Sequence, residues 1–581
     1  MREYDVIIVG AGMAGLRAAV GTVKRGLKVA VITKVHPLRS HSVAASGGIN
    51  AVLPQNGEAQ QPSDSIEQHY RDTLECGYSL SEPEAVEIMV SRAPGMIREM
   101  ERWGCLFSRE KDNRIAVRNM GGATFPRTVY ASDKTGHVMM NTLYEQCVRL
   151  RQNKPDQLRF FEEWFVTKLL VLNNTVAGVV ALEIATGKME IFSAKSVIWA
   201  TGGSGRVYGS TSNPLTNSGW GLAVPLYAGA ALMDIEFVQF HPTQLSGTHI
   251  LITEAARGEG AVLLNLKGER FLGSYEDSKR NMELSSRDIV SRNIRREILA
   301  GRGVNAACVH LDMQVIGSRN IKNRLPGVRE LCKTYANLDP VRQLIPVTPG
   351  QHYTIGGIRT NEKAETEING FFAAGECACA GIHGANRMGG NSLLETLVFG
   401  EIASSGAAEY ISQKHVRVPN KQYFENAFED EKNKISALLE RKGKTRPAEI
   451  RDRMQAAMDE FAGIYRDGMG LVEAGKIIKE LKNIYRDDLG VDGKELRVNY
   501  GLIDAIELRG SLDLADIIIQ AALKRNESIG VHFRNDFPSR KGRPRHSVVR
   551  LQKGKIRIHY LPVRDKKNLF DLLPSVWKAK R

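Results

Sequence analysis

A glycine-rich turn near the N-terminus constrains the fold of this chain more than any other feature. The apolar, β-branched run at residues 4–9 (YDVIIV) predicts a buried parallel strand. The turn at residues 10–15 (GAGMAG) follows directly, and a helix is expected from residue 16. A second strand is expected at residues 28–32 (KVAVI). Strand, G-x-G-x-x-G, helix and strand in this order predict a doubly wound α/β fold.

The same turn predicts a dinucleotide site. Gly10 permits the tight turn, Gly12 lets the backbone approach a pyrophosphate, and Gly15 allows close helix packing. The phosphates would meet the free N–H groups and the positive dipole of the helix start. The second strand of such folds usually ends in an acidic residue that holds a ribose hydroxyl. Here it ends in Thr33-Lys34, and Glu376 is a candidate for a cofactor-facing carboxylate instead.

Glu376 ends the run at residues 370–376 (GFFAAGE), which we interpret as a late strand that returns to the same sheet. The alternative is an ordinary surface glutamate after a strand. A histidine also stands close to the nucleotide motif, in the Gly-containing loop at residues 39–48 (RSHSVAASGG). Presented beside a bound dinucleotide, His41 is well placed to bond covalently to a flavin.

Composition limits the class of protein. With 581 residues and 42% hydrophobic content, the chain can form two to four domains. It has no apolar run long enough for a transmembrane helix, and it begins directly with a strand, so we expect neither a membrane span nor a signal peptide or twin-arginine leader. Seven scattered cysteines without a C-x-x-C pair argue against disulfides, zinc or iron–sulfur clusters and favour a reducing cytosol.

The net charge of +15 arises partly from basic runs at residues 539–546 (SRKGRPRH) and 564–567 (RDKK). No aromatic interleaving or nucleic-acid motif accompanies them, so nucleic acid is not an expected partner. A solvated face, an acidic protein partner and an anionic lipid surface remain as interpretations.

The pattern of elements predicts five regions. Residues 1–240 alternate strands and helices, with a hairpin at 165–182 that leads into a strand at 196–200. Residues 241–347 lose this rhythm and suggest an inserted domain, and residues 348–415 resume it and end in a helix that begins near Ser392. Residues 416–535 are charged and helical by period, with one helix opened by Pro447. Residues 536–581 are basic and expected to be strand-rich.

Five further motifs follow along the chain, at residues 240–243 (FHPT), 251–260 (LITEAARGEG), 286–288 (SRD), 352–357 (HYTIGG) and 383–393 (HGANRMGGNSL). Together with the His41 loop, and in this order, they resemble the flavoprotein subunit of succinate dehydrogenase and fumarate reductase. The resemblance runs from residue 1 to about residue 410 and continues more weakly to about 538. It implies a Rossmann-like FAD-binding domain with an inserted α+β capping domain, then a helical domain and a small C-terminal domain.

The resemblance also implies residue roles. His41 would carry an 8α-linked FAD, and Arg287 would donate or accept the proton, with Glu254 and Arg257 as its relay. The implied binding groups for a C4 dicarboxylate are His241, Thr253, His352 and Arg387, with Gly48 and Leu251 lining the site. The implied cofactor contacts are Gly10, Ala11, Gly12, Met13, Ala14, Gly15, Thr33, Lys34, Ser40, His41, Ser42, Gly47, Gly48, Glu376, Arg387, Asn391, Ser392 and Leu393. No metal site is expected.

Three segments depart from the family pattern. Residues 218–221 (SGWG) replace Thr-Gly-Asp-Gly and put Trp220 at an acidic, cofactor-adjacent position. Residues 120–122 (MGG) replace Phe-Gly-Gly over the substrate, and residues 528–532 (SIGVH) replace Ser-Arg-Gly-Ala-His at an expected partner surface. The carboxylate-binding and proton-handling groups are unchanged.

Three functions follow as hypotheses. The first is a covalent-FAD enzyme that interconverts succinate and fumarate, exchanges electrons with an iron–sulfur subunit, and lies on the cytoplasmic face of a membrane through anchor subunits. The second is an L-aspartate oxidase, which resembles the same domains but normally lacks the flavin-linking histidine, so His41 argues against it. The third is a flavin-free assembly subunit, against which the full set of polar site residues argues.

Overall fold

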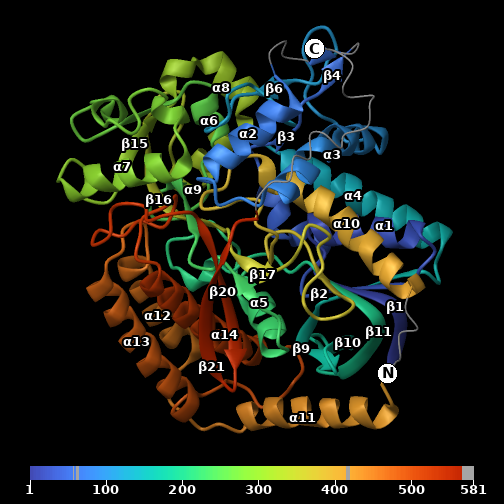
Figure 1. The fold of residues 1–581 in the computed structure, drawn as a ribbon. Coiled ribbons are helices and arrows are strands. Elements are labelled where there is room, and N and C mark those ends of the chain that lie inside the picture. The colour runs from blue at the N-terminus through green and yellow to red at the C-terminus, as the bar shows by residue number, and fades with distance from the viewer. Residues whose placement is uncertain (56–57, 60–63, 414–418, 565–581) are drawn as a thin grey trace.

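The computed structural model describes residues 1–55, 58–59, 64–413 and 419–564, so residues 565–567 of the predicted basic run lie outside the described residues. A seven-stranded sheet forms the centre of the N-terminal region, in the order β8-β2-β1-β11-β10-β9 with β18 beside β11 (Figure 1). Its strands are β1 (Arg2–Val9), β2 (Val29–Thr33), β8 (Leu158–Glu162), β9 (Trp164–Leu172), β10 (Thr175–Glu183), β11 (Met189–Trp199) and β18 (Phe371–Ala373).

The pairing confirms the predicted α/β fold. β1, β2, β8, β11 and β18 pair in parallel, whereas β9 and β10 form the predicted hairpin and join β11 antiparallel. The late strand expected before Glu376 returns to the sheet as β18, with Val197 opposite Phe371. Because side chains alternate along a strand, Val6 and Ile8 of β1 pack into one core cluster and Ile7 and Val9 into another.

Helices cover one face of this sheet. They are α1 (Met13–Lys24), α4 (Thr135–Asn153) and α10 (Asn391–Gln413), with α3 (Pro83–Arg102) packed on α10 and α2 (Ile66–Cys76) packed on α3. Figure 1 shows α1, α4 and α10 running side by side above the strands. Small strands pair nearby: β3 (Ile49–Asn50), β6 (Val117–Arg118) and β7 (Thr128–Val129) in one sheet, and β4 (Pro54–Gln55) and β5 (Glu58–Ala59) in another.

The inserted α+β region has a core of its own. Its sheet runs β13-β16-β15-β14, from β13 (Val238–Leu245), β16 (Ile345–Thr354), β15 (Val309–Asp312) and β14 (Val262–Leu264). The helices of this region are α6 (Ala255–Gly258), α7 (Arg287–Leu299), α8 (Ser318–Arg324) and α9 (Pro326–Ala336). Leu263, Val290, Ile294, Leu311 and Val347 belong to its separate apolar cluster. The inserted region is thus a packing unit of its own, and β16 contacts residues 205–207, which follow β11.

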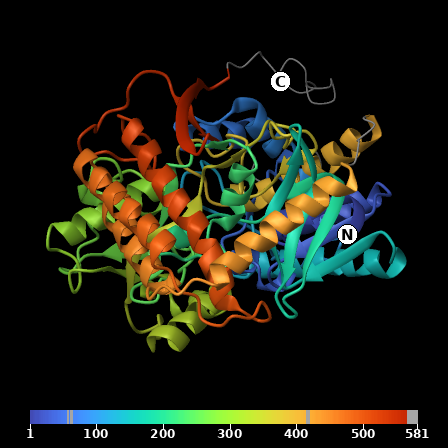
Figure 2. The same cartoon turned by 90° about the horizontal axis from the view of Figure 1, so that it is seen from below.

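Four helices follow: α11 (Lys421–Leu439), α12 (Pro447–Phe461), α13 (Gly468–Asp487) and α14 (Tyr500–Lys524). Pro447 opens α12 as the sequence predicts. Figure 2 shows α12, α13 and α14 packed together, while α11 lies across the strands β9 and β11. The long helix α14 also packs on α5 (Trp220–Tyr227), so the helical region reaches the nucleotide-binding region.

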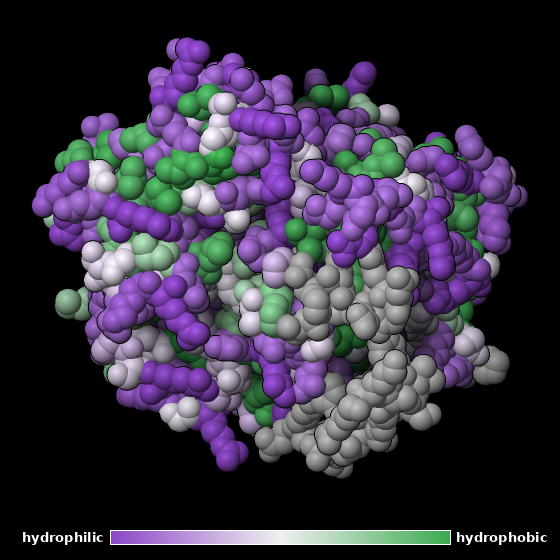
Figure 3. Space-filling view, turned by 90° about the horizontal axis from the view of Figure 1, so that it is seen from above, coloured by the Kyte–Doolittle hydropathy of each residue, from purple (hydrophilic) through white to green (hydrophobic). Residues whose placement is uncertain are grey.

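The predicted strands near the C-terminus are present as the hairpin β20 (Arg545–Gln552) and β21 (Lys555–Pro562). The hairpin completes a sheet with β12 (Leu232–Met233), β17 (Gly357–Arg359) and β19 (Ala378–Cys379), in the order β19-β17-β12-β20-β21. The face in Figure 3 is mostly hydrophilic, with apolar residues in small groups. Among the described helices, none has the length and apolar character needed to cross a bilayer. All seven cysteines are buried and free.

Candidate active site

One elongated cavity runs from the carboxyl ends of β1 and β2, past the His41 loop, to the inserted region. All but three of the residues predicted for the site line it. They are Gly10, Ala11, Gly12, Met13, Ala14, Thr33, Lys34, Ser40, His41, Ser42, Gly47, Gly48, His241, Leu251, Thr253, Glu254, Arg287, His352, Glu376, Arg387, Ser392 and Leu393. Gly15, Arg257 and Asn391 are outside its lining. We call the end at Gly10 and Gly12 the nucleotide end of the cavity, and the end at Arg287 and Arg387 the polar end.

The glycine turn forms the nucleotide end. Gly10 has φ +100°, and a Cβ there would lie 2.2 Å from the carbonyl oxygen of Ala200, so the turn needs glycine. A Cβ on Gly15 would lie 2.0 Å from the oxygen of Gly10, which places Gly15 in helix packing and not in the cavity wall. Gly12 precedes α1 without a side-chain cap. Apart from the N–H of Met13, which donates to Ser42, the N–H groups of the first turn of α1 therefore remain for a pyrophosphate at this end of the cavity.

The His41 loop forms the middle of the cavity. His41 begins the short 3-10 helix η2 (His41–Ala44), and the hydroxyl of Ser42 accepts a hydrogen bond from Met13 N–H at 3.2 Å. This contact fixes the loop against the start of α1. Desolvation lowers the pKa of His41 to about 4. At neutral pH its imidazole is therefore uncharged and keeps a free nitrogen lone pair.

Glu376 follows β18 and reaches the same cavity. Its Oε1 accepts a hydrogen bond from the backbone N–H of Thr354 at 3.0 Å. Burial raises the pKa of its carboxyl to about 7. A Cβ on Gly203 would lie 2.3 Å from Glu376 Oε1, so the glycine after β11 makes room for the carboxyl.

Three charged side chains meet at the polar end. Arg287, the first residue of α7, donates from Nε to Glu254 Oε2 at 2.7 Å, and its Nη2 lies 2.6 Å from the same oxygen. Arg257 Nη2 lies 3.9 Å from Glu254 Oε1. Burial raises the pKa of Glu254, but the charges of Arg287 and Arg257 lower it to about 2. The predicted trio is thus contiguous, with Arg257 buried behind Glu254 and away from the cavity.

Gln239 bridges the two cavity arginines, and sequence reasoning did not single it out. Its Oε1 accepts from Arg387 Nε at 3.2 Å and from Arg287 Nη1 at 3.3 Å. Its Nε2 donates to the carbonyl of Arg387 at 2.8 Å and to Asn386 Oδ1 at 2.9 Å. The only sequence signal was its place immediately before the 240–243 motif.

Two histidines and an arginine surround the remaining polar space. The rings of His241 and His352 lie 5.1 Å apart, edge to face. Burial and the charge of Arg287 hold the pKa of both well below the usual range. His241 Nδ1 accepts from the backbone N–H of Thr243 at 3.2 Å, which leaves its Nε2 as the donor. Burial lowers the pKa of Arg387 to about 9, and its guanidinium lies 4.5 Å from the ring centroid of Tyr353.

Asn391, one of the predicted cofactor contacts, lies outside the lining of the cavity. Its Oδ1 accepts from Asn50 Nδ2 at 2.8 Å and lies 2.9 Å from His69 Nε2, and its Nδ2 donates to Thr73 Oγ1 at 3.0 Å. At the first turn of α10, the side chain points into this buried network because the helix packs there. Asn391 anchors the loop that carries Arg387 and does not face the cavity.

The three segments that differ from the family pattern can be located in the structure. Trp220 lines the cavity, and its Nε1 donates to the carbonyl of Val166 at 2.9 Å. Met120 also lines the cavity, and the next N–H, that of Gly121, donates to Glu254 Oε1 at 2.7 Å. In the segment at residues 528–532, His532 is buried, and the N–H of Val531 donates to the carbonyl of Ala385 at 2.9 Å.

The geometry fits a flavin dinucleotide. The open Gly12 turn and helix start can take a pyrophosphate, and the cavity continues to His41 and the polar end. The chain matches the family model of the FAD binding domain over residues 5–393 and that of the fumarate reductase flavoprotein C-terminal region over residues 451–576.

Relatives and solved structures agree over the full length. The chain is 42% identical over 580 residues to the fumarate reductase flavoprotein subunit of Mycobacterium tuberculosis (97% of each chain). It is 38% identical over 602 residues to the succinate dehydrogenase flavoprotein subunit of Rickettsia felis (100% of this chain, 98% of that one). The structure matches FrdA of E. coli quinol fumarate reductase with a TM-score of 0.92 and 36% identity (98% of each chain), and Mycobacterium smegmatis Sdh1 with 0.86 and 35% (100% and 97%). The chain therefore belongs to the family of succinate dehydrogenase and fumarate reductase flavoprotein subunits.

Proposed function

We propose that this protein interconverts succinate and fumarate with a bound FAD. The observation that carries the proposal is the shared cavity: the Arg287–Glu254 pair, His241, His352 and Arg387 face one space that is continuous with the nucleotide turn. When bound, FAD supplies hydride transfer at its N5 atom. The residues of this chain bind the substrate, orient it and move a proton.

A small dianion suits the polar end. A guanidinium fork can hold one carboxylate through two hydrogen bonds, and Arg387 faces the cavity with its position fixed by Gln239. Neutral His241 donates from Nε2 without a charge of its own. Thr253 and His352 line the same space, and Leu251 and Gly48 complete its wall. Fixing both carboxylates holds the C–C bond in one orientation, which lowers the entropic barrier to reaction.

Arg287 is the proposed proton donor and acceptor. Arg287 and Glu254 both line the cavity, and Glu254 lies between Arg287 and the buried Arg257. A proton that leaves Arg287 for the substrate carbon is replaced through Glu254, whose carboxylate first accepts a proton from Arg257 and then passes it to Arg287, which it contacts directly. Arg257 holds the far oxygen of Glu254 and connects the pair to the interior of the inserted region.

We further propose that His41 carries the flavin through an 8α bond. The support is the position of His41 midway along the cavity and its uncharged imidazole, because bond formation requires an unprotonated ring nitrogen. The remaining predicted cofactor contacts line the cavity, except Gly15, which packs the helix, and Asn391.

Electrons need a route out of the flavin. The proposed partner is an iron–sulfur subunit, with membrane anchor subunits that hold the assembly on the cytoplasmic face of the membrane. The relatives are named as subunits, and two solved neighbours are quinol fumarate reductases. Among the described residues no cluster of three His, Cys, Asp or Glu side chains could hold a metal ion.

The test measures flavin-dependent succinate oxidation and fumarate reduction with artificial electron carriers, beside L-aspartate oxidation by oxygen. The proposal predicts turnover of succinate and fumarate, and none of aspartate. Hydrogen peroxide formed only with aspartate would support the aspartate-oxidase alternative. A flavin-loaded protein inactive on all three substrates would support an assembly role.

A further inference from the structure

One carboxylate at the nucleotide end of the cavity comes from a helix far away in the sequence. Glu507 lies in α14, and its side chain lines the cavity while only 9% of it is exposed. Lys34, directly after β2, donates from Nζ to Glu507 Oε1 at 2.7 Å. The helical region therefore supplies a charged group to the cavity wall that β2 forms.

The end of β2 lacks the carboxylate that a dinucleotide site needs there. In such folds an acidic residue at this position accepts hydrogen bonds from the ribose hydroxyls. Here Lys34 occupies the position, and an ammonium group only donates. The ion pair with Lys34 brings a carboxylate back to the same end of the cavity.

The other two cavity carboxylates among the described residues have different places. Glu254 is held by Arg287 at the polar end, and Glu376 is bound by the N–H of Thr354. Of the described residues that line the cavity, Glu507 alone offers a carboxylate beside the end of β2.

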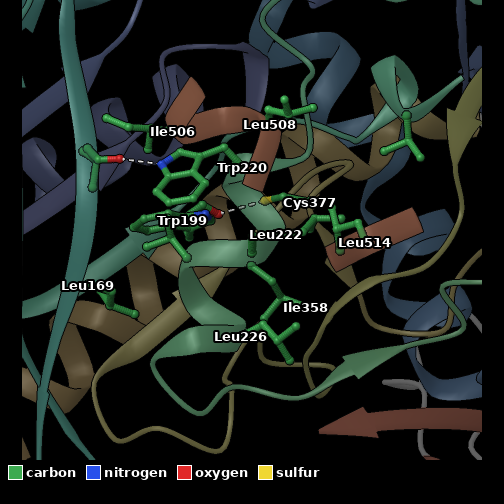
Figure 4. Close-up of a cluster of buried hydrophobic side chains, with 14 of the residues drawn as sticks. Leu169, Trp199, Trp220, Leu222, Leu226, Ile358, Cys377, Ile506, Leu508 and Leu514 are labelled. Atoms are coloured by element: carbon green, nitrogen blue, oxygen red, sulfur yellow. Dashed lines mark hydrogen bonds between the residues drawn. The ribbon is translucent and has the colours of Figure 1, made fainter. Parts of the chain in front are cut away.

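The indole of Trp220 packs against α14 close to Glu507. Its indole N–H is used by the carbonyl of Val166, and its ring stacks on Phe165 with centroids 6.1 Å apart. Figure 4 shows the indole in the apolar cluster with Ile506 and Leu508, the two neighbours of Glu507. A Cβ on Gly510 would lie 2.9 Å from Trp220 Cε3, so helix and indole are in close contact. The indole thus supports the turn of α14 that presents Glu507.

We propose that Glu507, oriented by Lys34, binds the adenosine ribose of FAD by accepting hydrogen bonds from its hydroxyl groups. This role concerns the cofactor and not the dicarboxylate. It rests on the FAD-binding fold, and its test needs no turnover.

The test compares FAD release in a His41→Ser background, where the flavin is held without a covalent bond. Glu507→Leu removes the acceptor oxygens and is expected to speed FAD release about 10- to 100-fold, because hydrogen bonds to charged groups contribute about 1.5–3 kcal/mol. Asp504→Leu is the matched control. Asp504 is on the same helix, pairs with Arg451 and is outside the cavity lining, so its loss should leave FAD release unchanged.

A second ligand separates a ribose contact from a loss of fold. The proteins are also loaded with an FAD analogue that has 2′,3′-dideoxyadenosine in place of adenosine. In the His41→Ser parent the analogue should leave about tenfold faster than FAD or more, whereas with Glu507→Leu the two ligands should leave at the same rate. For Glu507→Gln, which keeps one acceptor oxygen, the ratio of the two release rates should fall between that of the His41→Ser parent and that of Glu507→Leu. An equal penalty for the analogue with and without Glu507 would overturn the proposal.

Discussion

Replacing Arg287 by lysine separates charge from proton transfer at the polar end of the cavity. Arg287 contacts Glu254 Oε2 from two nitrogens, at 2.7 and 2.6 Å, and also reaches Gln239. A lysine ammonium keeps the positive charge but can replace only one of these contacts. We therefore expect substrate binding to survive and the relay through Glu254 to fail.

The expected loss of rate follows from the proposed role of Arg287 as a general acid. Loss of a positioned general acid costs about 10²- to 10⁴-fold in rate, or about 3–5 kcal/mol of activation free energy. The fumarate KM should change by less than about tenfold, since the charge remains. The assay is steady-state fumarate reduction with a reduced dye, with kcat expressed per bound flavin.

Arg292→Lys is the matched control. Arg292 is a buried arginine on the same helix, it pairs with Asp288 at 2.8 Å, and it does not line the cavity. Its lysine variant should keep kcat close to wild type. A kcat for Arg287→Lys within about tenfold of wild type would refute the proton-transfer assignment.

Two further predictions concern buried polar groups. Gln239→Leu leaves Arg287 and Arg387 without their shared acceptor, so kcat/KM for fumarate should fall about 10- to 100-fold; an unchanged value would show that Gln239 does not position them. Burial would lower the pKa of His546, but Asp234 and Glu82 raise it to about 9. This raised pKa contributes stability that is fully present below about pH 6.5 and lost as the pH rises to 9. Urea unfolding at both ends of this range should show a loss on the order of 3 kcal/mol that is absent from His546→Gln, and equal losses in both proteins would contradict the assignment.

The sequence predicted those parts of the site whose function depends on local backbone geometry. Gly10 needs a positive φ and lies against Ala200, and the G-x-G-x-x-G pattern records that constraint. The strand before Glu376 was recognisable because a short apolar run ending in Gly-Glu is typical of a buried parallel strand. His41, Arg287 and Arg387 stood in motifs whose residue types suit their chemistry.

The features that the sequence did not reveal depend on packing over long sequence distances and on side-chain direction. Glu507 lies 473 residues after Lys34, and its neighbours Ile506 and Leu508 give no local sign of a cavity carboxylate. Asn391 stands in a predicted motif, but its side chain turns into the network with His69. Local sequence patterns reveal neither the approach of α14 to the cavity nor the rotation of α10 about its axis, because both depend on how the helices pack.

Acid precipitation of the purified protein, followed by mapping of flavin-bearing peptides, tests the central claim most directly. If His41 holds FAD covalently beside a dicarboxylate site, yellow flavin stays with the washed precipitate and is recovered on the peptide that contains His41. The same preparation should oxidise succinate before precipitation. Active protein whose flavin passes entirely into the acid supernatant would contradict the account.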